Sequence, residues 1–476
     1  MLLFSTDIVL PVQNRIMLFS SSDEVLDLEW PLPEKEYISR CLDTKQKLFL
    51  LNRYDHFEII LITDPEKKGD ALVESLRIAG YDIHELANRF KWEELVLDNR
   101  TREDRYAEAL AEGLALSGYQ FMKYFSKPDE KRHSLQRLGV LKGKPDMIRE
   151  LSARIDSVTI CRDLVNEPAA FLNAPQLGLE ITRMCREVGL TVEVLDKIQI
   201  ESLKMGGLLA VNRGSIDPPR FIIITWEPEK AVNSAPLVLI GKGIMFDTGG
   251  LSLKPTPASM DEMKSDMAGA AAVAGILYGI ARLGLPVKVV GLIPATDNRP
   301  DGNAFAPGDV IRMHDGTSVE VMNCDAEGRL ILADALSYAK KYQPGLVIDL
   351  ATLTGSAQMT LGSEAAAMMG NAPDQVFSIL EQAGFSVHER LVRFPLWEEY
   401  GKLLDSEIAD VKNIGGRMAG AIAAGKFLER FTNYPWIHLD IAGTAYLISR
   451  ESYRGIGGTG TGVRLLLEFI KKQYQL

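Results

Sequence analysis

The residues of this chain best suited to chemistry are two carboxylates and a guanidinium in the stretch 323–330, Asn-Cys-Asp-Ala-Glu-Gly-Arg-Leu. Asp325 and Glu327 stand two positions apart, so they cannot share a helix face and converge only where the backbone is irregular or extended. We expect Gly328 to supply the freedom for such a turn. The pattern predicts a metal site at the start of a buried helix. The alternative is a solvated, capped helix start, where acidic residues are also favoured.

A second group of charged residues lies upstream, between a predicted strand and a predicted helix. Residues 237–240 form a short apolar run typical of a buried strand, and Lys242 falls at its carboxyl end, where open α/β sheets bind ligands. Residues 267–285 are rich in Ala, Gly, Ile and Leu, which indicates a helix packed closely against that sheet. The charged residues beside these apolar elements are Lys242, Asp247, Lys254, Asp266, Asp325, Glu327 and Arg329. Buried charges must be paired or must coordinate a cation.

The composition of this charged set indicates which metals it would hold. Four carboxylates gathered in one place raise one another's pKa unless cations neutralise them, and two divalent ions would do so. Oxygen ligands suit Mg, Mn or Zn, whereas the absence of His and Cys from the set argues against a structural zinc site. The histidines form no HExxH or HxH pattern, so each is expected at the surface or in packing. They are His56, His84, His133, His314, His388 and His438.

These residues give the chain a resemblance to the leucyl aminopeptidase family, the dinuclear cytosol aminopeptidases. The family signature Asn-Thr-Asp-Ala-Glu-Gly-Arg corresponds to residues 323–329, with Cys324 in the usual Thr place. We expect Cys324 to be a spectator; the alternative is a thiol that binds soft metals. The run 254–260 is a residue longer than in many relatives, which is expected to move this loop while Asp266 stays on its helix. Other similar segments are 242–254, 260–270, 349–355, 408–413, 438–444 and 461–464.

The resemblance implies a ligand set for two divalent ions, Zn or Mn. Asp247, Asp325 and Glu327 would hold one ion, and Asp247 and Glu327 would bridge to a second ion that Lys242 and Asp266 also hold. A lysine amine donates a lone pair only when neutral. The pKa of Lys242, about 10.4 for a free lysine, would therefore have to be lowered by the adjacent dications.

The resemblance also implies a mechanism. Two metals would lower the pKa of a bridging water towards about 7, and binding of the substrate's free α-amine by the second metal would make the enzyme an exopeptidase. Lys254 would stay charged and stabilise the carbonyl oxygen or oxyanion, and Arg329 would hold a bicarbonate that acts as general base. The first side chain of the peptide, Leu or a similar apolar residue, would enter a pocket. The pocket residues would be Met263, Thr352, Gly355 and Ala442.

Two other classes of function are weighed against an aminopeptidase that acts on peptides with a free N-terminus. The first is a regulatory or DNA-binding protein that retains the peptidase fold, and it predicts DNA retention by an inactive Asp325→Asn variant. The second is a nucleotide-dependent enzyme. It rests on a GxGxxG match at 455–460, too near the C-terminus for a dinucleotide-binding unit, and on a P-loop imitation at 420–427. In the latter, Phe427 stands where a Ser or Thr must reach magnesium, so a tightly packed helix is expected.

The composition is that of an ordinary globular enzyme. The net charge of −11 indicates no nucleic-acid partner. No apolar run approaches about 18 residues and the N-terminus lacks the basic start of a signal peptide, so we expect a cytoplasmic protein without a membrane contact. Four widely spaced cysteines fit reduced thiols.

At 476 residues the chain is expected to form two or three domains of α/β class. We predict an N-terminal α/β domain at 1–146 that ends in a polar linker (126–146), a connecting helix at 147–165, and a catalytic domain at 166–476 with a mixed sheet covered on both faces. Strands are predicted at 8–11, 15–19, 48–51, 57–62, 221–224, 287–292, 346–350 and 436–441, and a long helix at 102–125. The family resemblance further implies a homohexamer.

Overall fold

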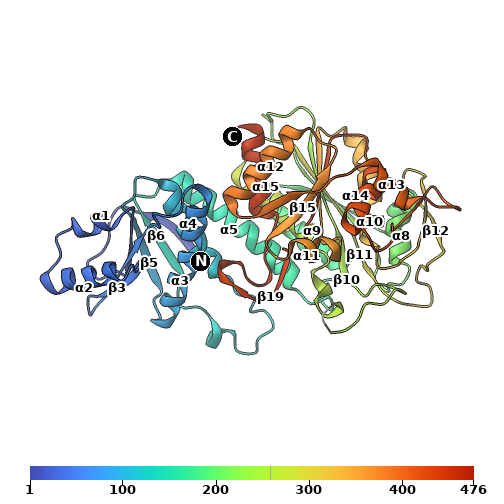
Figure 1. The fold of residues 1–476 in the computed structure, drawn as a ribbon. Helices are drawn as coiled ribbons and strands as arrows, with labels where there is room; N and C mark the ends of the chain where they lie inside the picture. The colour runs from blue at the N-terminus through green and yellow to red at the C-terminus, as the bar shows by residue number, and fades with distance from the viewer. Residues whose placement is uncertain (258) are drawn as a thin grey trace. The chain divides into compact units, whose positions relative to one another are not determined.

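The computed structural model describes residues 1–257 and 259–476, which form two compact units (Figure 1). The first unit consists of Met1–Ile155 with Ser449–Gly455, and the second of Asp156–Ile448 with Ile456–Leu476. Helix α5, Pro145–Asn166, covers the predicted helix at 147–165 and contains the point where the first unit gives way to the second. The prediction about the loop at 254–260 falls partly on Ala258, which lies outside the described residues.

The first unit is built on a six-stranded sheet in the order β1-β6-β5-β2-β4-β3. Its neighbouring strands are parallel except for the antiparallel pair β3 and β4. Met17 and Phe19 of β2 pack with Ile38 of α2 in a hydrophobic cluster, while α4 packs against β5 and β6. The strands are β1 Leu2–Thr6, β2 Arg15–Phe19, β3 Leu48–Asn52, β4 Phe57–Ile62, β5 Glu94–Asn99 and β6 Arg137–Leu141. The helices are α1 Ser22–Leu26, α2 Leu32–Asp43, α3 Gly69–Arg89, α4 Asp104–Ser117 and η1 Pro128–Lys131.

Three expectations for this unit were wrong. Residues 8–11 form no strand, because the first strand is β1 and Pro11 begins a turn. The helix expected at 102–125 is α4 and ends at Ser117. The segment expected as a polar linker contains β6, which lies between β1 and β5 in the sheet. Leu138 and Val140 of β6 are buried. Polar residues on both sides of this five-residue strand hid it in the sequence.

The sheet of the second unit is mixed, as predicted, and has nine strands. Eight strands follow the order β16-β15-β18-β14-β9-β11-β8-β7, and β10 pairs in parallel with β11. The strands β18, β14, β9 and β11 are mutually parallel, whereas β8 runs antiparallel to β11 and β7 runs antiparallel to β8. Their bounds are β7 Thr191–Leu195, β8 Arg220–Trp226, β9 Leu237–Gly241, β10 Gly243–Asp247, β11 Val289–Asn298, β14 Leu346–Ala351, β15 Ala365–Gly370, β16 Arg390–Arg393 and β18 Trp436–Asp440.

Helices cover both faces of this sheet. Side chains alternate across a strand, so neighbouring positions of β11 face opposite sides. A Cβ at Gly291 would lie against Val273 of α9, whereas Val290 and Leu292 belong to the cluster that includes the apolar residues of α10. The helices and 3₁₀ turns are α6 Ala174–Val188, α7 Lys197–Ser202, α8 Gly206–Asn212, η2 Met260–Ser265, α9 Ala268–Leu283, α10 Gly328–Ala339, η3 Lys340–Tyr342, α11 Gly355–Leu361, α12 Asp374–Val387, α13 Glu398–Gly401, η4 Lys402–Leu404, α14 Gly420–Glu429, η5 Ser452–Arg454 and α15 Val463–Tyr474, of which η5 belongs to the first unit.

One segment, Met260–Leu283, is long and apolar enough to cross a membrane by length and composition alone. It comprises η2 and α9, and 89% of its most apolar window is buried inside the structure. Such burial is typical of a core helix, and a helix buried on all sides is apolar on all sides.

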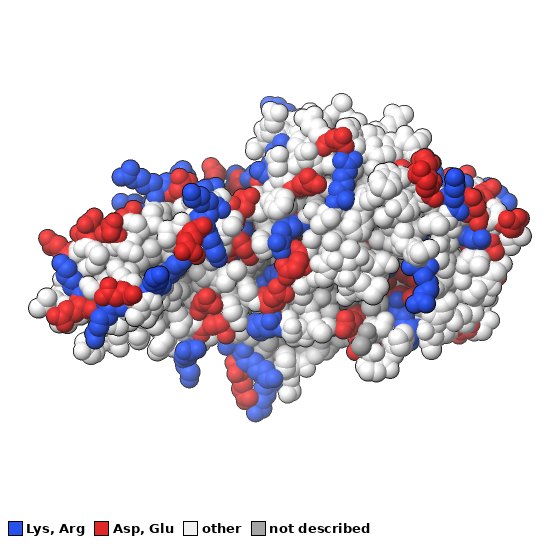
Figure 2. All heavy atoms as spheres, viewed as in Figure 1, with Lys and Arg blue, Asp and Glu red and all other residues white. Residues whose placement is uncertain are grey.

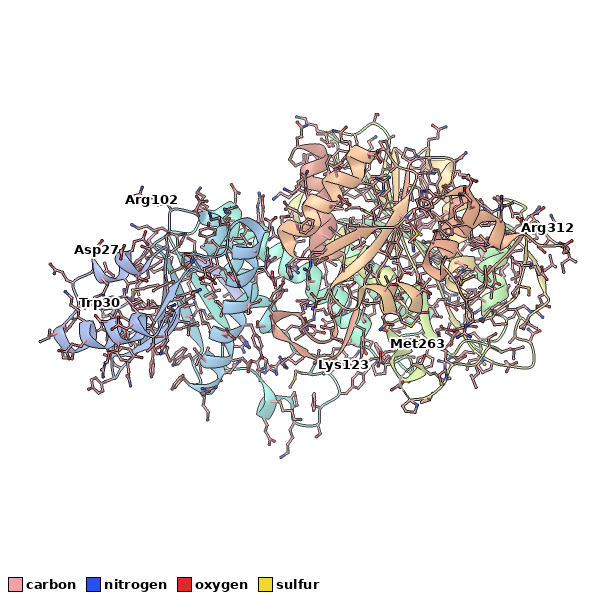
Figure 3. The ribbon with its side chains drawn as sticks, in the orientation of Figure 1. Asp27, Trp30, Arg102, Lys123, Met263 and Arg312 are labelled. Atoms are coloured by element: carbon pink, nitrogen blue, oxygen red, sulfur yellow. The ribbon has the colours of Figure 1, made fainter. Side chains whose placement is uncertain are left out.

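Two small sheets complete the fold. One is β12-β13-β17, with bounds Val310–Arg312, Ser318–Glu320 and Val411–Lys412; the other is β19-β20, with bounds Tyr446–Glu451 and Gly455–Gly458. On the face drawn in Figure 2, basic and acidic side chains are interspersed. Figure 3 labels Met263, which lies on η2.

Candidate active site

The predicted site residues come together at the carboxyl ends of parallel strands in the second unit. Lys242 follows β9 directly, and Gly241, its neighbour, pairs with Leu350 of β14. Asp247 ends β10 and pairs with Asn298 at the end of β11. Because parallel strands end at the same edge of a sheet, Lys242 and Asp247 lie at the edge where ligands bind in such folds.

The other two segments that carry predicted ligands approach this edge from helix ends. Asp266 was expected to lie on a helix. It lies instead between the end of η2 and the start of α9. Glu327 is the N-cap residue directly before α10, and Asp325 lies in the irregular turn before it. The prediction that the acidic pair stands where a buried helix begins is confirmed.

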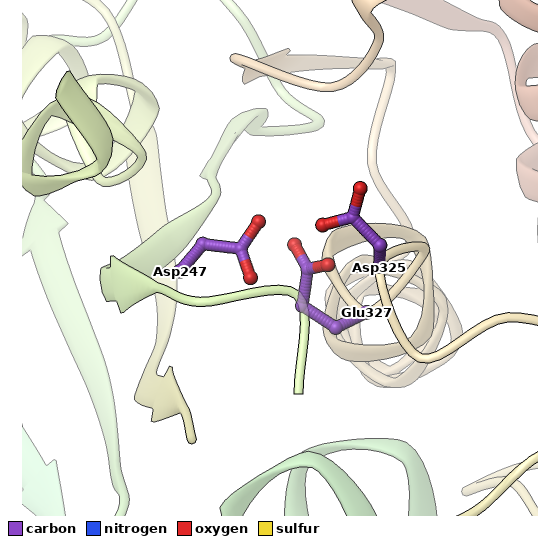
Figure 4. Close-up of side chains that lie close together, drawn as sticks. All are labelled: Asp247, Asp325 and Glu327. Carbon is purple, nitrogen blue, oxygen red and sulfur yellow. The ribbon is translucent and has the colours of Figure 1, made fainter. Parts of the chain in front are cut away.

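Three carboxylates converge in the cluster shown in Figure 4. One ligand atom from each of Asp247, Asp325 and Glu327 lies within 4.8 Å of the others. Burial, together with the neighbouring carboxylates of Asp247 and Glu327, raises the pKa of Asp325 to about 7 against the opposing effect of Lys254. Burial also raises the pKa of Asp266 well above its usual value. The cluster therefore carries the repulsion between like charges that bound cations relieve.

Two lysines supply positive charge among these carboxylates. The Nζ of Lys242 lies 2.7 Å from Asp266 Oδ1 and 3.1 Å from Glu327 Oε1. The Nζ of Lys254 lies 2.9 Å from Asp247 Oδ2 and 2.5 Å from Asp325 Oδ1. Burial lowers the pKa of both lysines, but the carboxylates outweigh burial and hold each pKa above its ordinary value. The pairing of each lysine with two carboxylates places both ammonium groups inside the site.

Unpartnered oxygen atoms test whether this site fits a metal. Among the described residues, the buried Asp266 Oδ2 and Glu327 Oε2 accept no hydrogen bond. A buried carboxylate oxygen without a partner is costly, so both atoms are suited to a ligand that brings positive charge. All four carboxylates offer hard oxygen donors of the kind that Mg, Mn and Zn accept. The donor set therefore fits divalent metal.

Arg329 is buried in the first turn of α10, beside the carboxylates. Its Nη1 donates to the main-chain oxygen of Asn413 over 2.7 Å, while its Nε has no partner among the described residues. Burial lowers the pKa of Arg329 to about 10, and the carboxylates of Glu327 and Asp440 oppose this effect. The guanidinium thus stays cationic at neutral pH and keeps a donor for a further group.

Of the four predicted pocket residues, Thr352 is in direct contact with the charged cluster. Its Oγ1 donates to Asp266 Oδ1 over 2.8 Å, and its carbonyl oxygen accepts from Lys242 Nζ over 2.8 Å. Met263 lies on η2 next to the Asp266 segment, and Gly355 begins α11. Contact of Met263, Gly355 and Ala442 with a substrate stays a prediction.

Asp440, which the sequence analysis did not single out, holds together the two loops that carry the predicted pocket residues Thr352 and Ala442. Its Oδ1 accepts from Leu353 N over 3.1 Å and from Ala442 N over 3.2 Å, and its Oδ2 accepts from Thr354 Oγ1 over 2.7 Å. The residue is 1% exposed and pairs in the sheet with Ala351. One buried carboxylate therefore joins the loop after β14 to the loop after β18.

Asn298 is a second residue that the sequence analysis missed. Its Nδ2 donates to Asp247 Oδ1 over 2.8 Å and to the carbonyl oxygen of Cys324 over 3.0 Å. It thereby fixes the carboxylate of Asp247 to the turn that carries Asp325 and Glu327. A signal was present, because Asn298 is an amide at the carboxyl end of an apolar strand.

The expectation for Gly328 was wrong. Gly328 has no positive φ and lies in the regular helix α10. A Cβ at this position would meet Cε of Lys242 and would lie 2.7 Å from its Nζ. The glycine is needed because Lys242 occupies the space of a side chain.

Residues set aside in the sequence analysis have structural partners. Cys324 is buried in the main hydrophobic cluster and its Sγ donates to the carbonyl oxygen of Phe305 over 3.2 Å. His438, which is buried, binds Asp349 through Nδ1 over 2.6 Å. The P-loop imitation is α14, a buried helix whose Lys426 pairs with Glu429.

Comparisons with known proteins agree with this geometry. The model of the "Cytosol aminopeptidase family, catalytic domain" matches residues 159–467. A "Probable cytosol aminopeptidase" of Geobacter sp. (strain M21) is 41% identical over 425 residues, which cover 87% of this chain and 86% of that protein. The chain belongs to the cytosol aminopeptidase family. It is therefore an aminopeptidase and a metalloexopeptidase.

A further relative and two solved structures extend the likeness. A "Probable cytosol aminopeptidase" of Chlorobaculum tepidum is 45% identical over 395 residues, which cover 78% of this chain and 76% of that protein. The cytosol aminopeptidase of Coxiella burnetii has a TM-score of 0.85 at 28% identity, covering 99% of both chains. The bottromycin maturation enzyme BotP in complex with Mn has a TM-score of 0.85 at 31% identity, covering 97% of this chain and 99% of that one.

Proposed function

We propose that this aminopeptidase releases an apolar first residue, with Leu preferred, from peptides with a free N-terminus. The proposal rests on the convergence of Asp247, Asp325 and Glu327 beside two lysines and an arginine. Carboxylates that converge beside cationic side chains are suited to metal-dependent hydrolysis.

The proposed metal ligands are Lys242, Asp247, Asp266, Asp325 and Glu327, for two divalent ions of Zn or Mn. The unpartnered oxygens of Asp266 and Glu327 support this assignment, and BotP, a relative, is described in complex with Mn. Such ions, when bound, supply Lewis-acid activation of water. Lys242 would have to give up its proton to act as a ligand, which requires cations to oppose the carboxylates that hold its pKa high.

Lys254 is proposed to act on the peptide carbonyl. Its ammonium is held at the site by Asp247 and Asp325, which also keep it protonated. A fixed positive charge stabilises the oxygen on which negative charge develops during hydrolysis. The role of this lysine is therefore electrostatic and needs no proton transfer.

Arg329 is proposed to bind bicarbonate, which would provide the general base. Support comes from the buried guanidinium, whose Nε has no partner among the described residues and whose charge suits an anion. In carbonate-free buffer kcat should be lower, and addition of bicarbonate to that buffer should restore kcat. An equal kcat in both buffers would contradict this role.

The pocket for the first side chain is proposed to include Met263, Thr352, Gly355 and Ala442. Apolar and small residues favour an apolar side chain over a charged one. Hydrolysis of a panel of aminoacyl amides by metal-free protein resupplied with Zn, Mn or Co separately would establish both the preferred residue and the metal. Preference for acidic first residues would contradict the assignment.

We also propose a cytoplasmic homohexamer that binds peptides and not nucleic acid. The cytoplasmic location is supported by the names of the relatives, and the exclusion of nucleic acid by the net charge of −11. Sedimentation at the mass of a single chain would contradict the hexamer.

Substitution of the ligands tests the proposed function. Glu327→Gln and Asp247→Asn should each abolish release of N-terminal residues while the unfolding temperature and circular dichroism stay near those of the wild type. The matched control is Glu407→Gln, which changes an exposed carboxylate of the same unit. Full activity in either ligand variant would contradict the proposal.

Substitution of Lys254 separates its role from metal binding. Lys254→Ala should lower kcat by on the order of 100- to 1000-fold, as loss of one oxyanion donor does, with metal content unchanged. Lys230→Ala removes an exposed lysine of the same unit and should leave kcat unaltered. Loss of metal together with activity would mean that Lys254 helps to hold the ions.

A further inference from the structure

Asn413 lies where a short strand meets the site. It follows β17, whose residues Val411 and Lys412 pair in parallel with β13. Its main-chain N–H continues this pairing by donating to the carbonyl oxygen of Glu320 over 3.0 Å. The side chain is fully buried, at 0% exposure. A polar side chain in such a position must have partners.

The amide of Asn413 binds the start of the turn that carries the ligand carboxylates. Its Oδ1 accepts from the main-chain N–H of Met322 over 2.8 Å and from that of Asn323 over 3.4 Å. Its Nδ2 donates to the carbonyl oxygen of Asn323 over 2.7 Å. The side chain thus both donates to and accepts from one stretch of backbone, which a carboxylate or an apolar side chain cannot do.

The main chain of Asn413 binds the guanidinium of Arg329. The carbonyl oxygen accepts from Nη1 over 2.7 Å, and among the described residues this is the hydrogen bond that the structure records for the guanidinium. One residue therefore contacts the turn that leads to Asp325 and Glu327 and also the side chain of Arg329. Its position sets the distance between the two.

We infer that Asn413 is a positioning residue for hydrolysis, which fixes the ligand turn relative to Arg329. The inference rests on the roles proposed above for Asp325, Glu327 and Arg329. Loss of the amide would free the backbone at Asn323 and leave the carbonyl of residue 413 able to shift with its strand. Small displacements of this kind in a preorganised site lower turnover without altering the residues that react.

Substitution of Asn413 tests the inference. Asn413→Ala should lower kcat by on the order of 10- to 100-fold, as substitutions behind metal ligands do, with little change in KM. Asn413→Asp keeps the volume and the acceptor but loses the donor to Asn323, and should also lower kcat. The matched control, Asn303→Ala, removes an exposed amide of the same unit and should keep the wild-type kcat. Wild-type kcat in both Asn413 variants would overturn the inference.

A double-mutant cycle with Arg329→Ala distinguishes positioning from a general loss of stability. If Asn413 acts through Arg329, its substitution should cost little further activity once the guanidinium is gone. The expected residual effect is below about threefold, compared with the 10- to 100-fold effect in the presence of Arg329. Multiplicative losses would overturn the inference. Asn413→Asp is carried through the same cycle, so that the result does not depend on the stability of the alanine variant.

The cycle also separates this inference from the proposed function. Full activity of Arg329→Ala alone would contradict the role of Arg329, and the coupling to Asn413 would fall with it. A large loss in Arg329→Ala, with multiplicative losses in the double variant, would leave the proposed function intact and overturn only the positioning role.

Discussion

At the scale of single residues, the side chain of Lys242 and the absence of one at Gly328 depend on each other. The lysine passes so close to Gly328 that a Cβ there would overlap its Cε. Its Nζ reaches Asp266 and Glu327 from this position. A glycine at the start of a helix is usually unfavourable, because alanine has the higher helix propensity. Here the glycine is retained for the space that it leaves.

This close approach predicts that Gly328→Ala lowers activity and does not stabilise the fold. Helix propensity favours the alanine by up to about 1 kcal/mol, but the new Cβ would displace the buried Lys242 from Asp266 and Glu327, which costs stability and should lower kcat/KM by on the order of 100-fold. Thermal unfolding and hydrolysis of a Leu amide measure the two effects. Gly302→Ala, in an exposed loop where a Cβ meets nothing within 4 Å, is the control and should keep full activity. Normal activity of Gly328→Ala would show that Lys242 tolerates displacement.

At the scale of elements, α10 does more than present Glu327 and Arg329. Its buried Asp334 accepts from Leu208 N in α8 and from His314 N in the loop after β12, both over 2.9 Å. The helix is thereby tied to the segments on its other side. Its first turn, which carries Arg329 and follows Glu327, is in this way held by contacts further along the same helix.

This contact predicts a pH dependence of stability. Burial raises the pKa of Asp334 from 3.8 to about 7, against the opposing hydrogen bonds from Leu208 and His314. Between these values the folded state retains a proton that the unfolded chain has released, so stability falls as pH rises from about 4 to about 7. Asp334→Asn should lose this slope, which amounts to at most about 4 kcal/mol, in denaturant unfolding at a series of pH values. Glu407→Gln should retain it, and an identical slope in Asp334→Asn would contradict the assignment.

At the scale of the whole molecule, the site joins parts of the second unit that are distant in the chain. Asp247 ends a strand of the main sheet, Asp266 precedes the core helix α9, and Glu327 caps the start of α10 on the opposite face. A cation bound among them would link both layers of helices to the sheet. Binding to the folded state alone adds stability by mass action.

Metal removal should therefore lower stability as well as activity. Chelated protein should unfold at a lower temperature than protein with excess Zn or Mn. Its free energy of unfolding should be lower by about 2.7 kcal/mol than at a metal concentration 100 times the dissociation constant. Scanning calorimetry with and without chelator measures the shift. Glu327→Gln should show a smaller shift, because it lacks one ligand. An unfolding temperature that chelator leaves unchanged, in protein shown to have lost its metal, would contradict the proposed site.

The sequence by itself determined the type of most elements near the site and the chemistry of its residues. Apolar runs predicted β9, β14 and β18, and the Ala-rich segment predicted α9, because burial imposes a local periodicity. The motif at 323–329 predicted the acidic pair at the start of α10. The strand β6 and the helix α3 were not predicted, because short or mixed patterns do not distinguish a buried strand or helix from a polar connection.

Only the tertiary structure decided which segments meet. The pairing of β10 with β11 and of β9 with β14 brings Asp247, Lys242 and Thr352 to one edge, and this strand order is not a local property of any segment. The need for glycine at 328 and the contacts of Asn298, Asn413 and Asp440 follow from that convergence. The type of one residue does not predict its contact with a residue far away in the chain, because packing between distant segments is set by the whole fold.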